Sequence, residues 1–346
     1  LDLWGGISAG RAAAARSAQA AQLDVEAAAI TVAGQLASAW YQRAATAASA
    51  ALLAEQLRAS EATLALVEAK VAAGAVPPLD ATSQAQAVEA LRGQLTTIGP
   101  QLAALEHAIN LLRGAAPNAP LPPAPTTLPA IPALPTTGVP AEVLTARPDV
   151  MAAWLRVQAS DRSVAVALAE QYPRLSLSAS LSSTGTLSGW VANLAANLVA
   201  PLVDGGSRAA AVDRSRAELE LSLLSYQRAV VSAAGEVEDA LVAEAGQAAL
   251  VASLDRQLAM AAKVADGVRA SYAAGGTDQL RVLDAERTYQ GLARSRVSAQ
   301  AQQLDDRIAL YRALAGRLTL TRPAKAAAEP RNSQVGTVEA RGLPPG

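Results

Sequence analysis

The stretch that decides the fold reads Leu175-Ser176-Leu177-Ser178-Ala179-Ser180-Leu181-Ser182. A second alternating run, residues 190–202, places leucines and alanines on one side and asparagines on the other. Successive side chains of a strand point to opposite faces, so each run predicts a β-strand with one apolar and one polar face. Each run also has about the length that a tilted strand needs to cross a bilayer. The residues expected to face a water-filled lumen are Ser176, Ser178, Ser180, Asn193 and Asn197.

The segments on either side of this hairpin have the length of very long helices. No proline occurs between Leu1 and Val76, and none between Leu202 and Thr321. Proline interrupts helices, so these stretches are where long helices are expected. The first, residues 7–71, would measure roughly 100 Å if it were helical throughout. A soluble hairpin with a solvated serine face would also explain the alternation, but helices of this length do not fit a compact α+β domain and favour the membrane interpretation.

Two apolar seams run along the first long helix. One contains Leu23, Ala27 and Ile30, and the other contains Val25 and Val32. The steps alternate between four and three residues, which is the period of coiled coils. A helix in a two-stranded coil needs one seam, whereas a helix in a closed ring of helices needs two. The two seams therefore predict a ring.

The second half of the chain repeats the plan of the first at a spacing of about 200 residues. Leu53 and Leu254 correspond, as do the helix-breaking residues Gly74 and Gly275, and Gly5-Gly6 is matched to Gly205-Gly206. Each unit contains a strand end, a very long helix, a tight turn and a return helix, which indicates duplication of a half-subunit. The predicted division is 1–114, first helical hairpin; 115–146, a proline-rich segment outside the helices; 147–171, a helix; 172–204, the β-hairpin; 205–316, second helical hairpin; and 317–346, a disordered tail.

Composition argues against several kinds of chemistry. The chain has no cysteine and a single histidine, His107, so a catalytic triad and a metal cluster of Cys or His ligands are not expected. The net charge of −1 argues against a nucleic-acid partner. The run Gly205-Gly206-Ser207-Arg208 lacks the ending of a phosphate-binding loop. No enzyme activity, cofactor or metal is therefore predicted, and no transmembrane helix, since no apolar run approaches 18 residues.

Four motifs carry a resemblance to a known family: Leu1-Asp2-Leu3-Trp4-Gly5, Arg147-Pro148-Asp149, Pro201-Leu202-Val203-Asp204-Gly205-Gly206 and Val282-Leu283-Asp284-Ala285-Glu286-Arg287. Their order and spacing resemble the outer-membrane efflux proteins, the TolC-like exit ducts of tripartite pumps, and within them the OprM/NodT-type lipoproteins. The resemblance implies a mainly α fold with a small transmembrane β part. Long antiparallel coiled-coil helices would form a periplasmic α-barrel, and the β-hairpin would contribute to a trimeric outer-membrane β-barrel.

The resemblance also implies partners and a function. The partners are two further copies in a homotrimer, a periplasmic adaptor (membrane fusion) protein, an inner-membrane RND-type pump and the outer-membrane lipids. The function is a passive exit duct for small molecules. Two alternatives stay open: a type I protein-secretion duct, which shares the fold, and a non-channel coiled-coil scaffold or adaptor, which has no use for a two-faced hairpin.

A gate is the functional site that the resemblance implies. In such ducts an acidic ring constricts the tunnel tip, and nearby Arg and Tyr residues hold it closed. The matching residues are Asp284, Arg287 and Tyr272, and Asp278 in the turn belongs to the same predicted group. The alternative for Asp284 and Arg287 is an ordinary i,i+3 helix pair, worth a few tenths of a kcal/mol.

The start of the chain departs from the family pattern. Full-length members carry a helix and a first β-hairpin before the position that Leu1 occupies, and the lipoproteins begin at an acylated Cys. The repeat points the same way, because the second unit has a helix and a hairpin before Gly205 and the first unit has none before Gly5. The interpretation is an N-terminally truncated subunit that supplies two strands instead of four.

Overall fold

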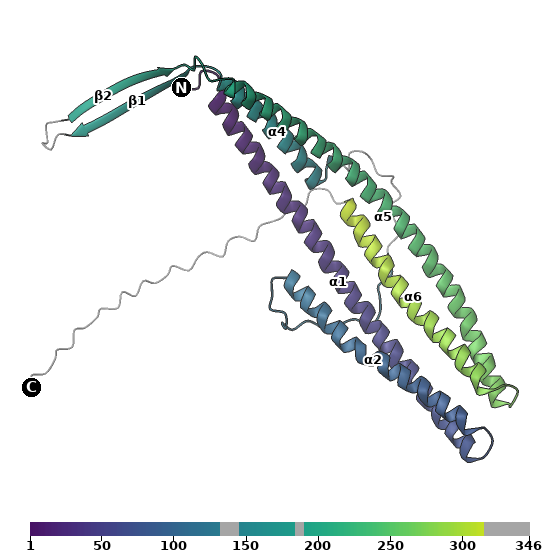
Figure 1. Cartoon of the computed structure of the whole chain (residues 1–346). Coiled ribbons are helices and arrows are strands. Elements are labelled where there is room, and N and C mark those ends of the chain that lie inside the picture. The colour runs from purple at the N-terminus through teal and green to yellow at the C-terminus, as the bar shows by residue number, and fades with distance from the viewer. Residues whose placement is uncertain (132–144, 184–189, 315–346) are drawn as a thin grey trace, which may run out of the picture.

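The chain forms a long helical bundle with one β-hairpin at its end. The computed structural model describes residues 1–131, 145–183 and 190–314. Its elements are α1 (Gly6–Ala72), α2 (Pro78–Leu112), α4 (Pro148–Ala169), β1 (Arg174–Ser183), β2 (Trp190–Val199), α5 (Ser207–Ala273) and α6 (Gln279–Ala313). Figure 1 shows the hairpin projecting from one end of the bundle and the two helix turns at the other. The mainly helical class with a small antiparallel sheet is confirmed. The predicted tail, residues 184–189 and part of the proline-rich segment lie outside the described residues.

The helices of the two repeats have identical lengths and are separated by a constant number of residues. Helices α1 and α5 each contain 67 residues, and α2 and α6 each contain 35. Both second-unit helices begin 201 positions after their counterparts. A left-handed glycine precedes each long helix, Gly5 with φ of 74° and Gly206 with φ of 86°, because a side chain there would be strained. Gly5 therefore corresponds to Gly206, which corrects the expected match of Gly5-Gly6 to Gly205-Gly206 by one residue.

The helices lie side by side in an open, curved layer. Helix α4 packs between α1 and α5 near the hairpin, and α6 packs between them toward the far end, with α2 on the outer side of α1 (Figure 1). The described residues include one buried apolar cluster, formed by Ala20, Leu23 and Ala152, where α1 meets α4. The second seam of α1 is not covered: Val25 is 61% exposed and Val32 is 41% exposed. The layer therefore has open edges.

Candidate gate and the two faces of the hairpin

The predicted gate residues lie together at the end of the bundle farthest from the hairpin, around the turn between α5 and α6. Asp278 is the N-cap of α6, and its Oδ1 accepts a hydrogen bond from the Arg281 backbone N–H at 2.9 Å. Asp284 and Arg287 are exposed on the first turns of α6. Within the described residues, Asp284 and Arg287 form no ion pair with each other. The alternative of an ordinary i,i+3 helix pair is therefore not seen in this structure.

Tyr272 joins the two helical hairpins near this tip. Its side chain is only 8% exposed, and the Lys70 ammonium of α1 lies 3.9 Å from the centre of its ring. Such a cation–π contact is strongest where water is excluded. Burial, and then the nearby Asp80 carboxylate, raise the pKa of the Tyr272 hydroxyl above its ordinary value. The Tyr272 hydroxyl therefore stays neutral at physiological pH. The side chain belongs to the second repeat and lies near Lys70 and Asp80 of the first repeat.

A buried polar contact that the sequence did not indicate lies beside it. The Gln84 amide of α2 donates to the backbone oxygen and the hydroxyl of Ser60 on α1, both at 3.0 Å. The Gln279 amide, at the start of α6, donates to Gln84 Oε1 at 3.0 Å. Gln84 and Gln279 are 0% and 2% exposed. We call these three residues the tip latch, since they fasten α6 to both helices of the first repeat.

Removing the latch should loosen the tip. We expect Gln84→Ala to lower the free energy of unfolding by about 1–3 kcal/mol, because the Gln279 amide and the Ser60 hydroxyl lose a buried partner. We also expect amide hydrogen exchange in residues 275–285 to become faster. Gln86→Ala, an exposed position on the same helix, is the control. Equal stability and equal exchange in both variants would show that the latch contributes nothing.

An ion pair fastens each helical hairpin at the same level, with the charges reversed between the repeats, and only the pair of the second repeat is buried on both sides. In the first repeat Arg43 of α1 pairs with Glu106 of α2 at 2.7 Å. In the second, Glu244 of α5 pairs with Arg307 of α6. Each residue stands 201 positions after its counterpart of opposite charge. Arg43 also donates to the backbone oxygen of Pro122 at 2.8 Å and so anchors the proline-rich segment.

The Arg147-Pro148-Asp149 motif begins α4, as its sequence indicates, and it also ties three helices together. The Arg147 guanidinium, which is largely buried, donates to Asp149 and to Glu236 of α5, both at 2.8 Å. It donates as well to the backbone oxygen of Ala313 at the end of α6, at 3.3 Å. Burial opposes ionisation of Asp149, but the hydrogen bonds and the positive charge of Arg147, with the backbone hydrogen bond from Val150, together outweigh it and hold the pKa of this carboxyl below its ordinary value.

The hairpin separates its polar and apolar residues on two faces. Ser176 lies opposite Asn197, and Ser180 lies opposite Asn193, with Ser178 between them. The other face carries cross-strand pairs of leucine and alanine, and its Leu194 is 74% exposed. Every residue of the two strands is exposed except Leu175, which is half-buried. Exposed leucines on one face and serines and asparagines on the other are typical of a surface between lipid and water.

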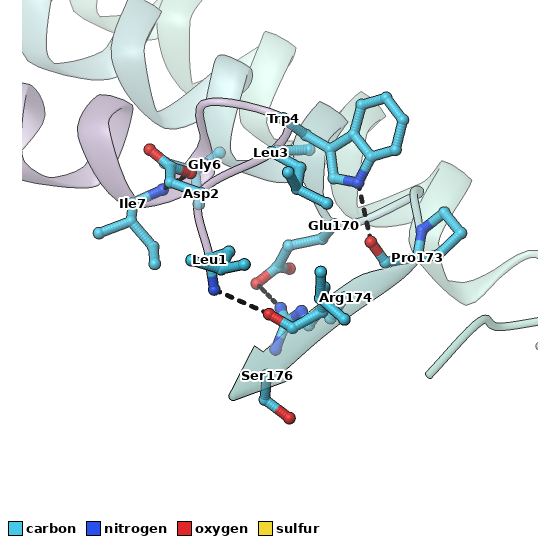
Figure 2. A pocket seen from close by; sticks show the side chains of 13 residues that line it. Leu1, Asp2, Leu3, Trp4, Gly6, Ile7, Glu170, Pro173, Arg174 and Ser176 are labelled. Atoms are coloured by element: carbon cyan, nitrogen blue, oxygen red, sulfur yellow. Dashed lines mark hydrogen bonds and ion pairs between the residues drawn. The ribbon is translucent and has the colours of Figure 1, made fainter. Parts of the chain in front are cut away.

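The N-terminal residues hold the base of the hairpin. Figure 2 shows the Trp4 indole N–H donating to the backbone oxygen of Pro173 at 2.8 Å, and the Leu1 amino group donating to that of Leu175, also at 2.8 Å. The Trp4 ring stacks on Tyr172 with 4.7 Å between centroids. Trp190 begins β2 at the other end of the hairpin. Tyr172 and Trp190 therefore stand at opposite ends of the strands, and aromatic side chains are enriched at both interfaces of a membrane.

Across residues 1–131, 145–183 and 190–314, no three or more acidic or histidine side chains have the arrangement of a metal site. In the same ranges, no helix has the length and the apolar content that a membrane crossing requires.

Paired long helical hairpins with a two-faced β-hairpin at one end define a channel subunit with a helical and a membrane part. The chain belongs to the outer membrane efflux protein family, whose model matches residues 1–115 and 139–316. Two relatives are the pyoverdine export outer membrane proteins OpmQ of Pseudomonas aeruginosa (30% identical over 321 residues) and Pseudomonas putida (29% over 322), and each match covers 91% of this chain and 68% of the relative.

The folds of solved outer-membrane channels match the fold of this chain. The outer-membrane channel OprN superposes with a TM-score of 0.84 at 25% identity, covering 91% of this chain and 73% of that one. The chain is thus an outer-membrane efflux channel component, with its long helices in the periplasm and its hairpin at the outer membrane. This membership excludes the coiled-coil scaffold and the adaptor.

Proposed function

We propose that three copies of this chain's protein form the passive exit duct of a tripartite efflux pump, and that the duct has no enzymatic activity. The observation that carries this proposal is the end-to-end arrangement of a hairpin of 10-residue strands and helices of 67 residues. The helices are roughly 100 Å long. The strands are roughly 33 Å long, enough to cross the hydrocarbon core when tilted. One subunit thus reaches from the membrane deep into the periplasm.

The faces of the hairpin support a trimer and a lipid environment. In the proposed duct, the face with Ser176, Ser180 and Asn193 lines the water, and the leucine face contacts outer-membrane lipids. Each strand of the described two-stranded sheet has one edge without a paired strand. Unpaired backbone groups are costly in lipid, so further strands must complete a closed barrel. A homotrimer supplies them symmetrically.

The cargo is proposed to be small molecules, moved by an RND-type pump in the inner membrane through a periplasmic adaptor that docks at the helical tip. Two relatives are named for pyoverdine export, which favours a small-molecule cargo over the protein cargo of a type I secretion duct.

The gate is proposed at the tip, where Asp284 and Arg287 are exposed and Tyr272 and Asp278 hold the turn. Three symmetry-related Asp284 carboxylates would face one another across the axis. Like charges close together disfavour a tight closed state unless cations balance them. Arg287, three residues along the same helix, is proposed to pair with an acid of a neighbouring copy, since it forms no ion pair with Asp284 in the described part of the chain.

Planar-bilayer recordings test both the duct and its gate. We expect the purified protein to give discrete single-channel currents, and Asp284→Ala with Arg287→Ala to raise the conductance because the constricting contacts are gone. The matched control is Ser83→Ala with Gln86→Ala, which stand 201 positions earlier in the first repeat. A protein that stays soluble and monomeric without detergent and gives no currents would contradict the duct. Currents unchanged by the double variant would contradict the gate alone.

A further inference from the structure

A groove runs along α1 where α2 and α6 pack on either side of it (Figure 1). Its volume is about 450 Å³, and residues of all three helices line it. Small-molecule sites in proteins commonly have volumes of about 300–1,000 Å³. Each helix contributes an alanine to the lining, Ala45 from α1, Ala104 from α2 and Ala301 from α6. Short side chains therefore leave room here for a small molecule.

Three polar side chains that line the groove have no hydrogen-bond partner among the described residues. They are Ser49 of α1, Gln101 of α2 and Ser298 of α6, one from each helix. Thr46, which lines the same groove, instead donates its hydroxyl to the backbone oxygen of Gln42 at 2.8 Å. The three unpartnered side chains therefore keep hydrogen-bond donors and acceptors that a bound molecule can use.

The lining of the groove carries no formal charge. None of the eleven residues that line it has an ionisable side chain. Its apolar surface includes Ile98 and Leu105 of α2 and Val297 of α6. A charged molecule would lose hydration there without gaining a charged partner. A molecule with an apolar body and uncharged hydrogen-bonding groups would satisfy both kinds of surface.

The second repeat does not reproduce this neutral surface. Ala104 and Leu105 belong to the lining of the groove. The residues 201 positions later, on α6, are Asp305 and Asp306. Asp305 stands beside the groove, where its Oδ2 accepts a hydrogen bond at 2.9 Å from the side chain of Gln42, one of the lining residues. A carboxylate at this edge repels an anion and so disfavours an anionic ligand.

The groove and the proline-rich segment lie on opposite faces of α1. Trp40 lines a second pocket together with Leu121 and Pro122 of that segment. Gln42, two residues further along α1, lines the groove, and two residues turn a helix by about 200°. A proline-rich segment inside the tunnel would obstruct it. In the proposed duct this segment therefore lies outside, and the groove opens to the tunnel.

We infer that this groove is a binding site for the cargo itself, and that it takes uncharged amphiphilic small molecules. The inference rests on the proposed duct and narrows the class of its cargo. The apolar surface holds the body of the molecule, while Ser49, Gln101 and Ser298 bond to its polar groups. Weak and reversible binding suits a duct, because a molecule in transit must leave the site as well as enter it.

Equilibrium dialysis with three matched fluorescent probes tests this inference. Dansyl amide is uncharged at neutral pH, dansyl glycine carries a carboxylate, and dansyl cadaverine carries an ammonium group. We expect the purified protein in detergent to bind dansyl amide saturably, with one site per chain, after subtraction of the binding to detergent alone. The affinity should be at least fivefold higher than for either charged probe. A charged probe that binds as tightly as dansyl amide would overturn the inference.

Filling the groove should abolish this binding. Ala104 lines the groove from an exposed position, so Ala104→Phe should fold and should weaken the binding of dansyl amide at least tenfold. Ala103→Phe is the matched control, because Ala103 is also exposed but does not line the groove. Its affinity should equal that of the wild type. Equal affinities in the two variants would mean that the probe binds elsewhere.

Protection of a thiol gives a second readout that needs no change in the shape of the groove. This chain has no cysteine, so Ser49→Cys introduces one thiol in the groove, and Ala48→Cys introduces one beside it, outside the lining. Saturating dansyl amide should slow the reaction of N-ethylmaleimide with the Ser49→Cys variant at least fivefold and leave that of the Ala48→Cys variant unchanged. Equal rates with and without dansyl amide in the Ser49→Cys variant would overturn the inference.

The bilayer recordings separate this inference from the proposed function. Single-channel currents without saturable binding of dansyl amide would overturn the inference and leave the duct standing. Binding without currents would contradict the duct, and with it the assignment of the groove to a tunnel wall.

Discussion

Leu194→Arg is expected to abolish assembly of the protein in membranes, whereas Asn193→Arg, one residue earlier, is expected to be tolerated. Leu194 stands opposite Ala179 on the apolar face of the hairpin and is 74% exposed. An arginine on the lipid face near the bilayer midplane costs roughly 2–4 kcal/mol. A symmetric trimer incurs that cost three times. Asn193 pairs with Ser180 on the polar face, where a charge would meet water.

The measurement is the fraction of protein recovered as detergent-extracted trimer from outer membranes, together with urea unfolding in lipid vesicles. Both variants add the same side chain to the same strand, so expression and β-propensity are matched. If Asn193→Arg were as damaging as Leu194→Arg, the assignment of lipid and water faces would be wrong. If neither mattered, the hairpin would not lie in a membrane.

Glu244→Ala is expected to destabilise the second helical hairpin by about 3–5 kcal/mol, since it leaves the Arg307 charge buried after its carboxylate partner is removed. The side chains of Arg307 and Glu244 are 6% and 4% exposed. The double variant Glu244→Arg with Arg307→Glu should recover most of that loss. The reason lies in the chain itself: the first repeat holds arginine and glutamate in that reversed order at Arg43 and Glu106.

Chemical unfolding in detergent, followed by circular dichroism, measures this effect. Glu106→Ala is the comparison, and its cost should be smaller because the Glu106 side chain is 40% exposed and water can replace it. A reversed pair no more stable than Glu244→Ala alone would mean that surroundings other than the partner charge decide the orientation of the pair.

Much of the fold followed from local patterns. The proline-free stretches correspond to α1 and α5, the glycine breaks to the tip turns, and the two alternating runs to β1 and β2. The cross-strand partners Ser176 and Asn197 are on one face because a strand has a period of two residues, which the sequence displays openly. Gly5 was matched to the wrong glycine by one position, since both members of Gly205-Gly206 have left-handed φ angles and only the helix start distinguishes them.

Local sequence patterns predicted less of the candidate site than of the fold. The prediction located the gate group at the turn between α5 and α6 because a family motif marks it there. It missed the tip latch, whose Gln84 and Gln279 stand 195 residues apart. It also missed the partner of Arg147, since Glu236 lies 89 residues away on another helix. A glutamine within an amphipathic helix looks the same in sequence whether it faces water or a buried amide.

The β-hairpin and the helical tip thus differ in what decides them, the local sequence for the first and the tertiary structure for the second. The sequence by itself determined the strands, the long helices, the repeat and the family, because these depend on backbone geometry and on periods of a few residues. Only the tertiary structure decided which polar side chains are buried together and how the charges of Arg43 and Glu244 are oriented. Those outcomes depend on how helices pack whose contacting residues stand from 24 to 195 positions apart in the chain, where a single contact has no periodic signal.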